Sequence, residues 1–345
     1  MTKNCREKEL DEAFVKIAEP PGEITKSRRV ASDGAIVFRQ DPDQKRRRCL
    51  LGCLGCIALL IVAFIKPLCS LAVHAGTTEL DSYILLVPFI SAYLIYIRRK
   101  QLPRECFPTP GFAMVPLGAG LAALAAPWSI RAWGWPLSHN DFLTLMALAF
   151  VCFLTGSGFF FLGRKWMAAA AFPIAFLIFM VPLPNRAVDW LETASKLAST
   201  DAAHLFFLLS GTPVLRDGTV FHLPGIVFEV AQECSGIRSS WALLMTGLVA
   251  SHLFLKSPWR RALFVAFIVP LGILRNGFRI LVIGLLCVHL GPNMIHSIIH
   301  KQGGPAFFAL SLFPLFLLLW WLRNCERPKS LRGGSEITQT PAVEL

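Results

Sequence analysis

Three segments of the chain carry residues whose types and positions could do chemistry. Cys234 stands in the polar stretch 232–240, directly before a long apolar run. Arg275 and Arg279 lie inside the next apolar run, and His300 comes shortly before the last one. A thiolate can attack a carbonyl carbon, a guanidinium can stabilise developing negative charge, and an imidazole can transfer protons near neutral pH. This combination of residue types predicts nucleophilic catalysis by a cysteine.

The position of Cys234 favours a reactive thiol. An apolar run of helical length begins at about residue 237, so Cys234 lies at the N-terminus of a predicted helix. The exposed N–H groups and the dipole at that end lower the pKa of a thiol and favour the thiolate. A cysteine that stands at a helix start without a chemical role is the alternative, and the position alone leaves it open.

Arg275 and Arg279 stand inside an apolar run that begins near Arg261. Guanidiniums in such a run are costly unless they pair or meet water. A rise of ~1.5 Å per residue places Arg275 ~21 Å and Arg279 ~27 Å from Arg261, in the outer half of a bilayer. Their spacing of four puts both on one helix face. We expect Arg275 to be functional, whereas for Arg279 snorkelling to outer phosphates is an equal alternative.

The composition places these segments in a membrane. The chain has 345 residues, of which 54% are hydrophobic and only 16% charged, where soluble domains have about 25%. Its net charge is +12, but the basic residues cluster at the ends of apolar runs, which indicates membrane topology and not nucleic-acid binding. The ten cysteines lie mostly in or beside apolar runs and form no paired framework.

Eight apolar runs are each near the length that crosses a bilayer as a helix. They cover about 49–65, 82–97, 111–128, 141–162, 166–183, 237–255, 261–290 and 304–322. If each run spans once, all the basic clusters fall on one side, which the positive-inside rule assigns to the cytoplasm. We therefore predict an all-α polytopic membrane protein of eight transmembrane helices in a cell membrane, with both termini in the cytoplasm. The predicted parts are a flexible basic arm (1–48), a membrane catalytic domain (49–322) and a cytoplasmic tail (323–345).

The longest predicted extracytoplasmic segment is 184–236. Its first part, 186–209, is expected to be an interfacial amphipathic helix that could cover an active site, or else a ninth element or a re-entrant segment. Further on, Arg216-Asp217-Gly218 between apolar alternations is a hairpin signal, so a small β element should lead into Cys234. This topology brings Cys234, Arg275 and His300 to one level at the outer face of the bilayer.

Three blocks in this order carry a resemblance to a known family: Cys-Ser-Gly-Ile-Arg-Ser from Cys234, Arg-Asn-Gly-Phe-Arg-Ile from Arg275 and His-Lys-Gln-Gly-Gly from His300. On a polytopic frame, over roughly residues 80–320, they resemble the exosortase/archaeosortase family of protein-sorting transpeptidases. The segment that leads into Cys234, from Gly218 to Ala231, also resembles the family, and an early block from Asp81 to Arg99 is a weaker match. Many members have an acidic residue after the histidine, whereas Lys301 stands there in this chain.

The resemblance implies Cys234 as nucleophile, with Arg275 and His300 as its catalytic partners. Glu233, Arg238 and Arg279 are the candidate substrate-binding residues. The substrates implied are secreted proteins whose C-terminal tail has a short motif, a transmembrane helix and a basic cluster, cut at the outer face of the membrane. The sequence does not decide which of Arg275 and His300 is the acid/base and which stabilises the oxyanion.

No cofactor or metal is expected. The spacing of Cys49, Cys53 and Cys56 matches an iron–sulfur motif, but it falls inside an apolar span, where small residues for helix packing explain it. Two other functions stay open. A membrane thiol acyltransferase would load a lipid on Cys234, and a transporter or scaffold for polysaccharide export would use the arginines as an anion path.

Overall fold

The computed structural model describes residues 42–77, 81–103, 105–230, 236–291 and 304–326. Residues 46–345 form one compact unit, which holds every element below except the first residues of α2. The elements, in chain order, are α2 (Pro42–Ala63), α3 (Ile65–Thr77), η1 (Ser82–Leu85), α4 (Val87–Ile97), α5 (Pro110–Ala132), α6 (His139–Phe161), α7 (Arg164–Ala169), α8 (Ala171–Phe176), η2 (Leu177–Met180), α9 (Asn185–Leu209), β1 (Leu215–Asp217), β2 (Val220–Leu223), β3 (Ile226–Glu229), α10 (Ile237–Phe254), α11 (Pro258–Leu290) and α13 (Gly304–Glu326).

The helical membrane architecture predicted from the sequence is confirmed, but the count of eight spans is not supported. In the described part of the chain, four helices are long and apolar enough to cross a membrane: α5, α6, α11 and α13. The number rises to six if each of two bent pairs is one span, namely α2 with α3, bent by 70°, and 171–180 with α9, bent by 93°. The apolar helix Ser82–Ile97 is shorter.

Prolines explain where the apolar runs break. A proline lacks an N–H, and its ring clashes with the carbonyl four residues earlier. Pro67 therefore separates α3 from α2, and Pro173 separates α8 from α7. The run 166–183, expected to be a single span, is not one continuous helix: most of α7, then α8 and η2, lie within it, and Pro182 and Pro184 then turn the chain into α9.

The segment expected to be helical at 186–209 is indeed the helix α9, which begins at Asn185. Its first turn is held against the start of α6, because the Asp141 carboxylate accepts a hydrogen bond from the Asn185 backbone N–H at 3.1 Å. Asn140 Nδ2 also donates to the Asn185 side-chain oxygen at 2.8 Å. The sharp bend before α9 is compatible with both an interfacial and a re-entrant helix, so this alternative stays open.

The predicted β element is a three-stranded antiparallel sheet of order β1-β2-β3. Asp217 pairs with Val220 across a two-residue turn that starts with Gly218, whose φ is 59°. Glycine is favoured where a turn needs a positive φ. The second turn is formed by Pro224 and Gly225, the residues that a type II turn favours at its two central positions.

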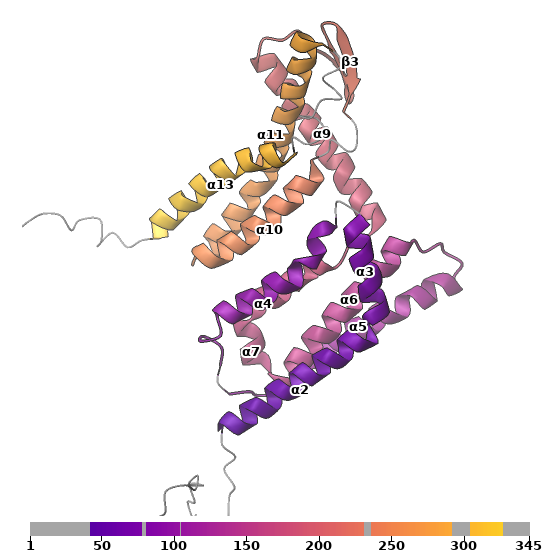
Figure 1. The fold of residues 1–345 in the computed structure, drawn as a ribbon, viewed down its shortest axis with the longest axis vertical. Helices are drawn as coiled ribbons and strands as arrows, with labels where there is room; N and C mark the ends of the chain where they lie inside the picture. Colours follow the sequence, from indigo (N-terminus) through magenta and orange to yellow (C-terminus); the bar gives the residue numbers. More distant parts are fainter. Residues whose placement is uncertain (1–41, 78–80, 104, 231–235, 292–303, 327–345) are drawn as a thin grey trace, which may run out of the picture. The chain divides into compact units, whose positions relative to one another are not determined.

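The helices pack through small residues and separate apolar clusters. α9 and α11 lie side by side, with the sheet next to them (Figure 1). Gly277 of α11 allows this approach, since a Cβ there would lie 2.7 Å from the Cβ of Ala202. A cluster of buried apolar side chains joins α10, α11 and α13 around Leu243, Phe264 and Leu315.

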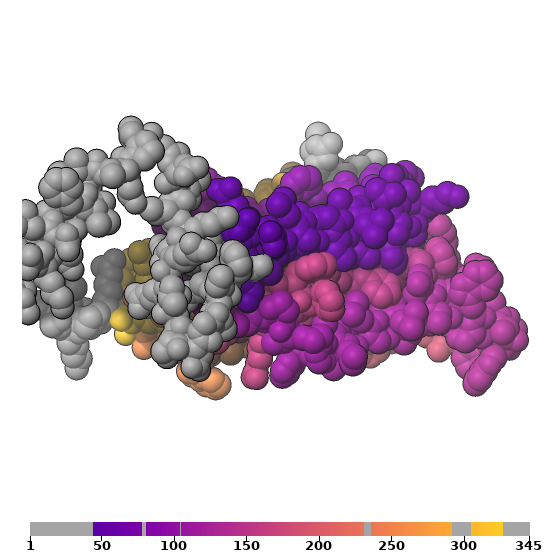
Figure 2. All heavy atoms as spheres, turned by 90° about the horizontal axis from the view of Figure 1, so that it is seen from below, coloured from indigo at the N-terminus to yellow at the C-terminus, as the bar shows by residue number. Residues whose placement is uncertain are grey.

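Many large apolar side chains remain on the outside of the helices. Leu51, Leu54 and Leu59 of α2 are each at least 60% exposed. Figure 2 shows the α2 and α3 residues, in indigo, along one face of the molecule. Extended apolar surface of this kind is rare on soluble monomers and is expected where a helix faces lipid.

Candidate active site

The candidate site begins where the chain enters α10. Gly236 is the N-cap residue of this helix, and its φ is 72°, in the left-handed region that favours glycine. A Cβ at Gly236 would also lie 2.6 Å from Cγ of Asn276 on α11. Backbone conformation and close packing therefore both require glycine here, two residues after Cys234 in the sequence.

Arg275 connects α11 to this helix start. Its side chain is 7% exposed, and its Nη2 donates hydrogen bonds of 3.1 Å to the Gly236 carbonyl oxygen and of 3.1 Å to Ser240 Oγ. Its Nη1 is buried, and within the described residues it has no hydrogen-bond partner. An unsatisfied buried donor is costly, and more so on a charged group.

Two aromatic contacts hold the first turns of α10 against the N-terminal helices. The ring of Trp241 lies with its centroid 6.3 Å from that of Tyr83 in η1 and 5.9 Å from that of Phe179 in η2. Met245, one turn further on, is buried in the cluster that also contains Phe150 and Phe176. The helix start that carries the Arg275 contact is therefore fixed from two sides.

The sheet and α9 support the segment that precedes the site. Phe207 of α9, Phe221 of β2 and Val230 are buried in one apolar cluster with residues of α11. Two ion pairs tie the sheet to α9: Lys196 Nζ lies 3.1 Å from Glu229 Oε1, and Arg216 Nη1 lies 2.6 Å from Asp201 Oδ1. This scaffold fixes Val230, the last described residue before Gly236.

The structure describes only some of the site residues that were predicted from the sequence. Cys234, Glu233 and His300 lie outside the described residues, so their roles stay predictions. Arg275 is buried against the start of α10, whereas Arg279, one turn further along α11, is half-buried. Arg238 is exposed on the first turn of α10.

Sequence reasoning missed three residues of the site: Gly236, Ser240 and Asn276. Each belongs to a block that drew attention for its charged or nucleophilic member, and none has a type that indicates chemistry by itself. The sequence did contain a signal for Ser240. Its hydroxyl lies in the first turns of a predicted helix, and two intramembrane arginines need hydrogen-bond partners.

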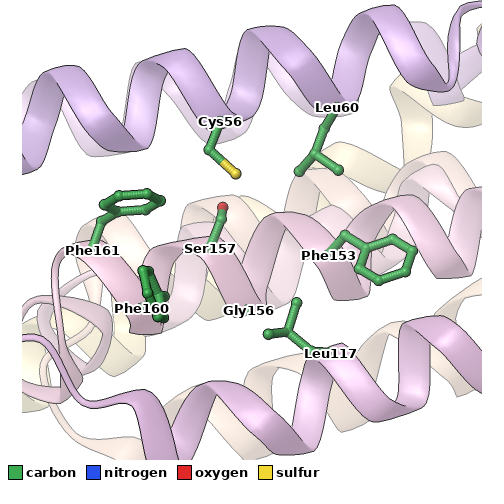
Figure 3. A pocket seen from close by; sticks show the side chains of 8 residues that line it. All are labelled: Cys56, Leu60, Leu117, Phe153, Gly156, Ser157, Phe160 and Phe161. Carbon is green, nitrogen blue, oxygen red and sulfur yellow. The ribbon is translucent and has the colours of Figure 1, made fainter.

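A cavity of about 290 Å³ lies elsewhere, between α2, α5 and α6 (Figure 3). It is lined by Cys56, Leu60, Leu117, Phe153, Gly156, Ser157, Phe160 and Phe161. Its walls are almost wholly apolar, and a site for catalysis needs convergent polar groups. Within the described residues, no three His, Cys, Asp or Glu side chains are grouped so that they could hold a metal ion.

Apolar helices of spanning length, exposed apolar side chains and a buried arginine at a helix start define a polytopic helical membrane protein with a polar site. Residues 75–317 match the family model of the transmembrane exosortases. This match covers more than half of the chain, so the protein belongs to the exosortase family, as the sequence blocks predicted. No curated protein and no solved structure gives a significant match.

Proposed function

We propose that the protein is a cysteine transpeptidase or protease that cleaves the C-terminal sorting tails of secreted proteins at the outer face of the cell membrane. The observation that carries the proposal is the buried Arg275, whose hydrogen bond to Gly236 ends two residues from Cys234 in the sequence. A cation near a thiol favours its thiolate, and a buried cation can stabilise an oxyanion.

The reaction follows from the residue types. The Cys234 thiolate attacks the scissile carbonyl carbon, and the C–N bond of the resulting tetrahedral intermediate then breaks to leave a thioester. His300 gives a proton to the leaving amine and takes one from the incoming amine or water, which attacks the thioester and releases the Cys234 thiolate. Arg275 stabilises the thiolate and the oxyanion. The substrates would be proteins whose tail has a short motif, a transmembrane helix and a basic cluster.

The proposed orientation has the active site outside and both termini in the cytoplasm. Arg98 directly follows α4, Arg164 begins α7, and Arg260 lies in the first turn of α11. The positive-inside rule assigns such basic helix ends to the cytoplasm, which supports this orientation. A C-terminal green fluorescent protein fusion should fluoresce, and a C-terminal alkaline phosphatase fusion should be inactive. The reverse pattern would contradict this orientation.

The function is tested by co-expressing a sorting-tail protein with the wild type and with Cys234→Ala, Arg275→Ala or His300→Ala. Loss of the tail is followed by gel shift, and the amount of each variant in the membrane is measured. The wild type should remove the tail and the three variants should not. Cys325→Ala, which changes an exposed cysteine on α13, is the matched control and should cleave like the wild type. Undiminished cleavage by Cys234→Ala would refute the proposal.

A further inference from the structure

The orientation of the Arg275 guanidinium depends on two acceptors of different kinds. Nη2 carries two hydrogens, and its two hydrogen bonds go to the Gly236 carbonyl oxygen and to Ser240 Oγ. The carbonyl belongs to the backbone and is present whatever the side chains are. Ser240 therefore supplies the side-chain acceptor for Nη2 in the described part of the chain.

Ser240 is itself held in place by close packing against α11. A Cβ added to Gly272 would lie 2.7 Å from Ser240 Oγ and 3.3 Å from Ser240 Cβ. Gly272 thus provides the space in which the hydroxyl sits, one helical turn before Arg275.

With Nη2 saturated, the buried Nη1 is the terminal nitrogen that stays available, since it has no hydrogen-bond partner among the described residues. Losing one of the two Nη2 contacts would let the planar guanidinium rotate about its bonds. Other acceptors would then compete for the Nη2 hydrogens. A charged donor acts on a thiolate or an oxyanion only when it is preorganised toward it.

We propose that Ser240 is a positioning residue, which fixes the rotation of the Arg275 guanidinium and so lets its charge act on the anionic species formed at Cys234. The proposal rests on the proposed role of Cys234 as the nucleophile. It assigns Ser240 no contact with the substrate and no proton transfer.

The first test measures how fast Cys234 reacts with iodoacetamide as a function of pH. The full-length protein is kept in detergent micelles, and alkylation of the Cys234 peptide is followed by mass spectrometry, which separates it from the other nine cysteines. Arg275→Ala should move the midpoint of the profile to higher pH. Ser240→Ala should move it in the same direction and slow alkylation at pH 7 by about tenfold, the size expected when a hydrogen bond to a charged group is lost.

Ser239→Ala is the matched control, because it makes the same change one residue earlier. Ser239 Oγ donates to the Gly236 carbonyl oxygen at 3.1 Å, and no hydrogen bond joins it to Arg275 in the described residues. Its profile should follow that of the wild type. A Ser240→Ala profile that coincides with the wild type, or an equal shift in Ser239→Ala, would overturn the proposal.

Gly272→Ala tests the same contact without changing Ser240. The added Cβ must displace the hydroxyl, while alanine itself favours the helix. The midpoint should again move to higher pH, and the double variant Gly272→Ala/Ser240→Ala should be no slower than Ser240→Ala alone. Additive losses would mean that the two residues act independently and would overturn the proposal.

The alkylation profile needs no substrate, so it separates the two proposals. If the wild type leaves every sorting tail intact but Ser240→Ala still shifts the profile, the proposed function fails and the positioning role stands. If Cys234→Ala abolishes cleavage and Ser240→Ala leaves both cleavage and the profile unchanged, the function stands and the positioning role fails. Thermal unfolding of each variant shows whether a shift merely reflects misfolding.

Discussion

Arg275 and Gly236, 39 residues apart in the sequence, are joined by a hydrogen bond of 3.1 Å from the arginine Nη2 to the glycine carbonyl oxygen. This contact locks α11 to the first turn of α10. It also shows why a guanidinium is tolerated in an apolar helix, since a buried charge needs partners. The predictions below follow from this contact and from the scaffold around it.

Arg275→Lys should abolish function although it keeps the positive charge. A lysine ammonium has a single nitrogen. It cannot replace both Nη2 hydrogen bonds and also present a second donor nitrogen, as the planar guanidinium does. We expect tail cleavage to fall by about 100-fold or more, the effect typical of removing one donor from an oxyanion site. Cleavage is measured by gel shift at equal membrane levels, and a rate within about twofold of the wild type would contradict the assignment.

Gly236→Ala should cost more stability than Gly225→Ala. Both positions have a positive φ, of 72° and 83°, so both variants should lose about 1–2 kcal/mol to backbone strain. A Cβ at Gly236 would in addition collide with Asn276, whereas nothing lies within 4 Å of a Cβ at Gly225. Thermal unfolding in detergent checks the order of the two variants, and equal midpoints would show that the Asn276 contact is loose.

Gly277→Ala should separate α9 from α11. The new Cβ would lie 2.7 Å from the Cβ of Ala202 and 3.0 Å from the backbone nitrogen of Ala203. Overpacking of this kind costs about 1–3 kcal/mol, which should lower the unfolding midpoint. Gly118→Ala in α5 is the control, since open space surrounds that position and alanine favours the helix. A Gly277→Ala midpoint equal to that of the control would contradict the close packing.

The sheet should loosen from α9 in acid. The hydrogen bond and the charge of Lys196, with the Thr219 hydroxyl, hold the pKa of the Glu229 carboxyl below its ordinary value of 4.5. A lowered folded-state pKa stabilises the fold above the unfolded pKa, and this is lost as the pH falls through the folded value. The unfolding midpoint of Glu229→Gln should therefore fall less than that of the wild type between pH 5 and pH 3. If the midpoints of the wild type and of Glu229→Gln fall in parallel, the Lys196–Glu229 pair contributes nothing to stability in this pH range.

The sequence predicted the helices well, because apolar runs of spanning length and basic ends follow directly from the bilayer. It misjudged how the runs divide. Pro173 and Pro182 lie in a run that is uniformly apolar, so hydropathy reports one span where the backbone must break. The turn signal Arg216-Asp217-Gly218 made the β element predictable, since the conformation of a tight turn is local.

The candidate site was predictable only in part. Arg275 drew attention because a guanidinium in an apolar run needs an explanation. Its partners Gly236 and Ser240 are ordinary residue types, and their pairing depends on how two helices pack across a separation of more than 30 residues. No local pattern reports such a contact. The convergence of Cys234 and His300 on this site remains a prediction, because both lie outside the described residues.

The most direct test of the central claim is the capture of a covalent intermediate on Cys234. The wild type is incubated with a sorting-tail protein, quenched in acid and digested, and the Cys234 peptide is analysed by mass spectrometry before and after treatment with hydroxylamine. The account predicts a hydroxylamine-sensitive thioester that joins Cys234 to the substrate residue before the cut. A wild type that cleaves the tail while Cys234 stays unmodified, or a fatty acyl thioester formed without any sorting-tail protein, would contradict it.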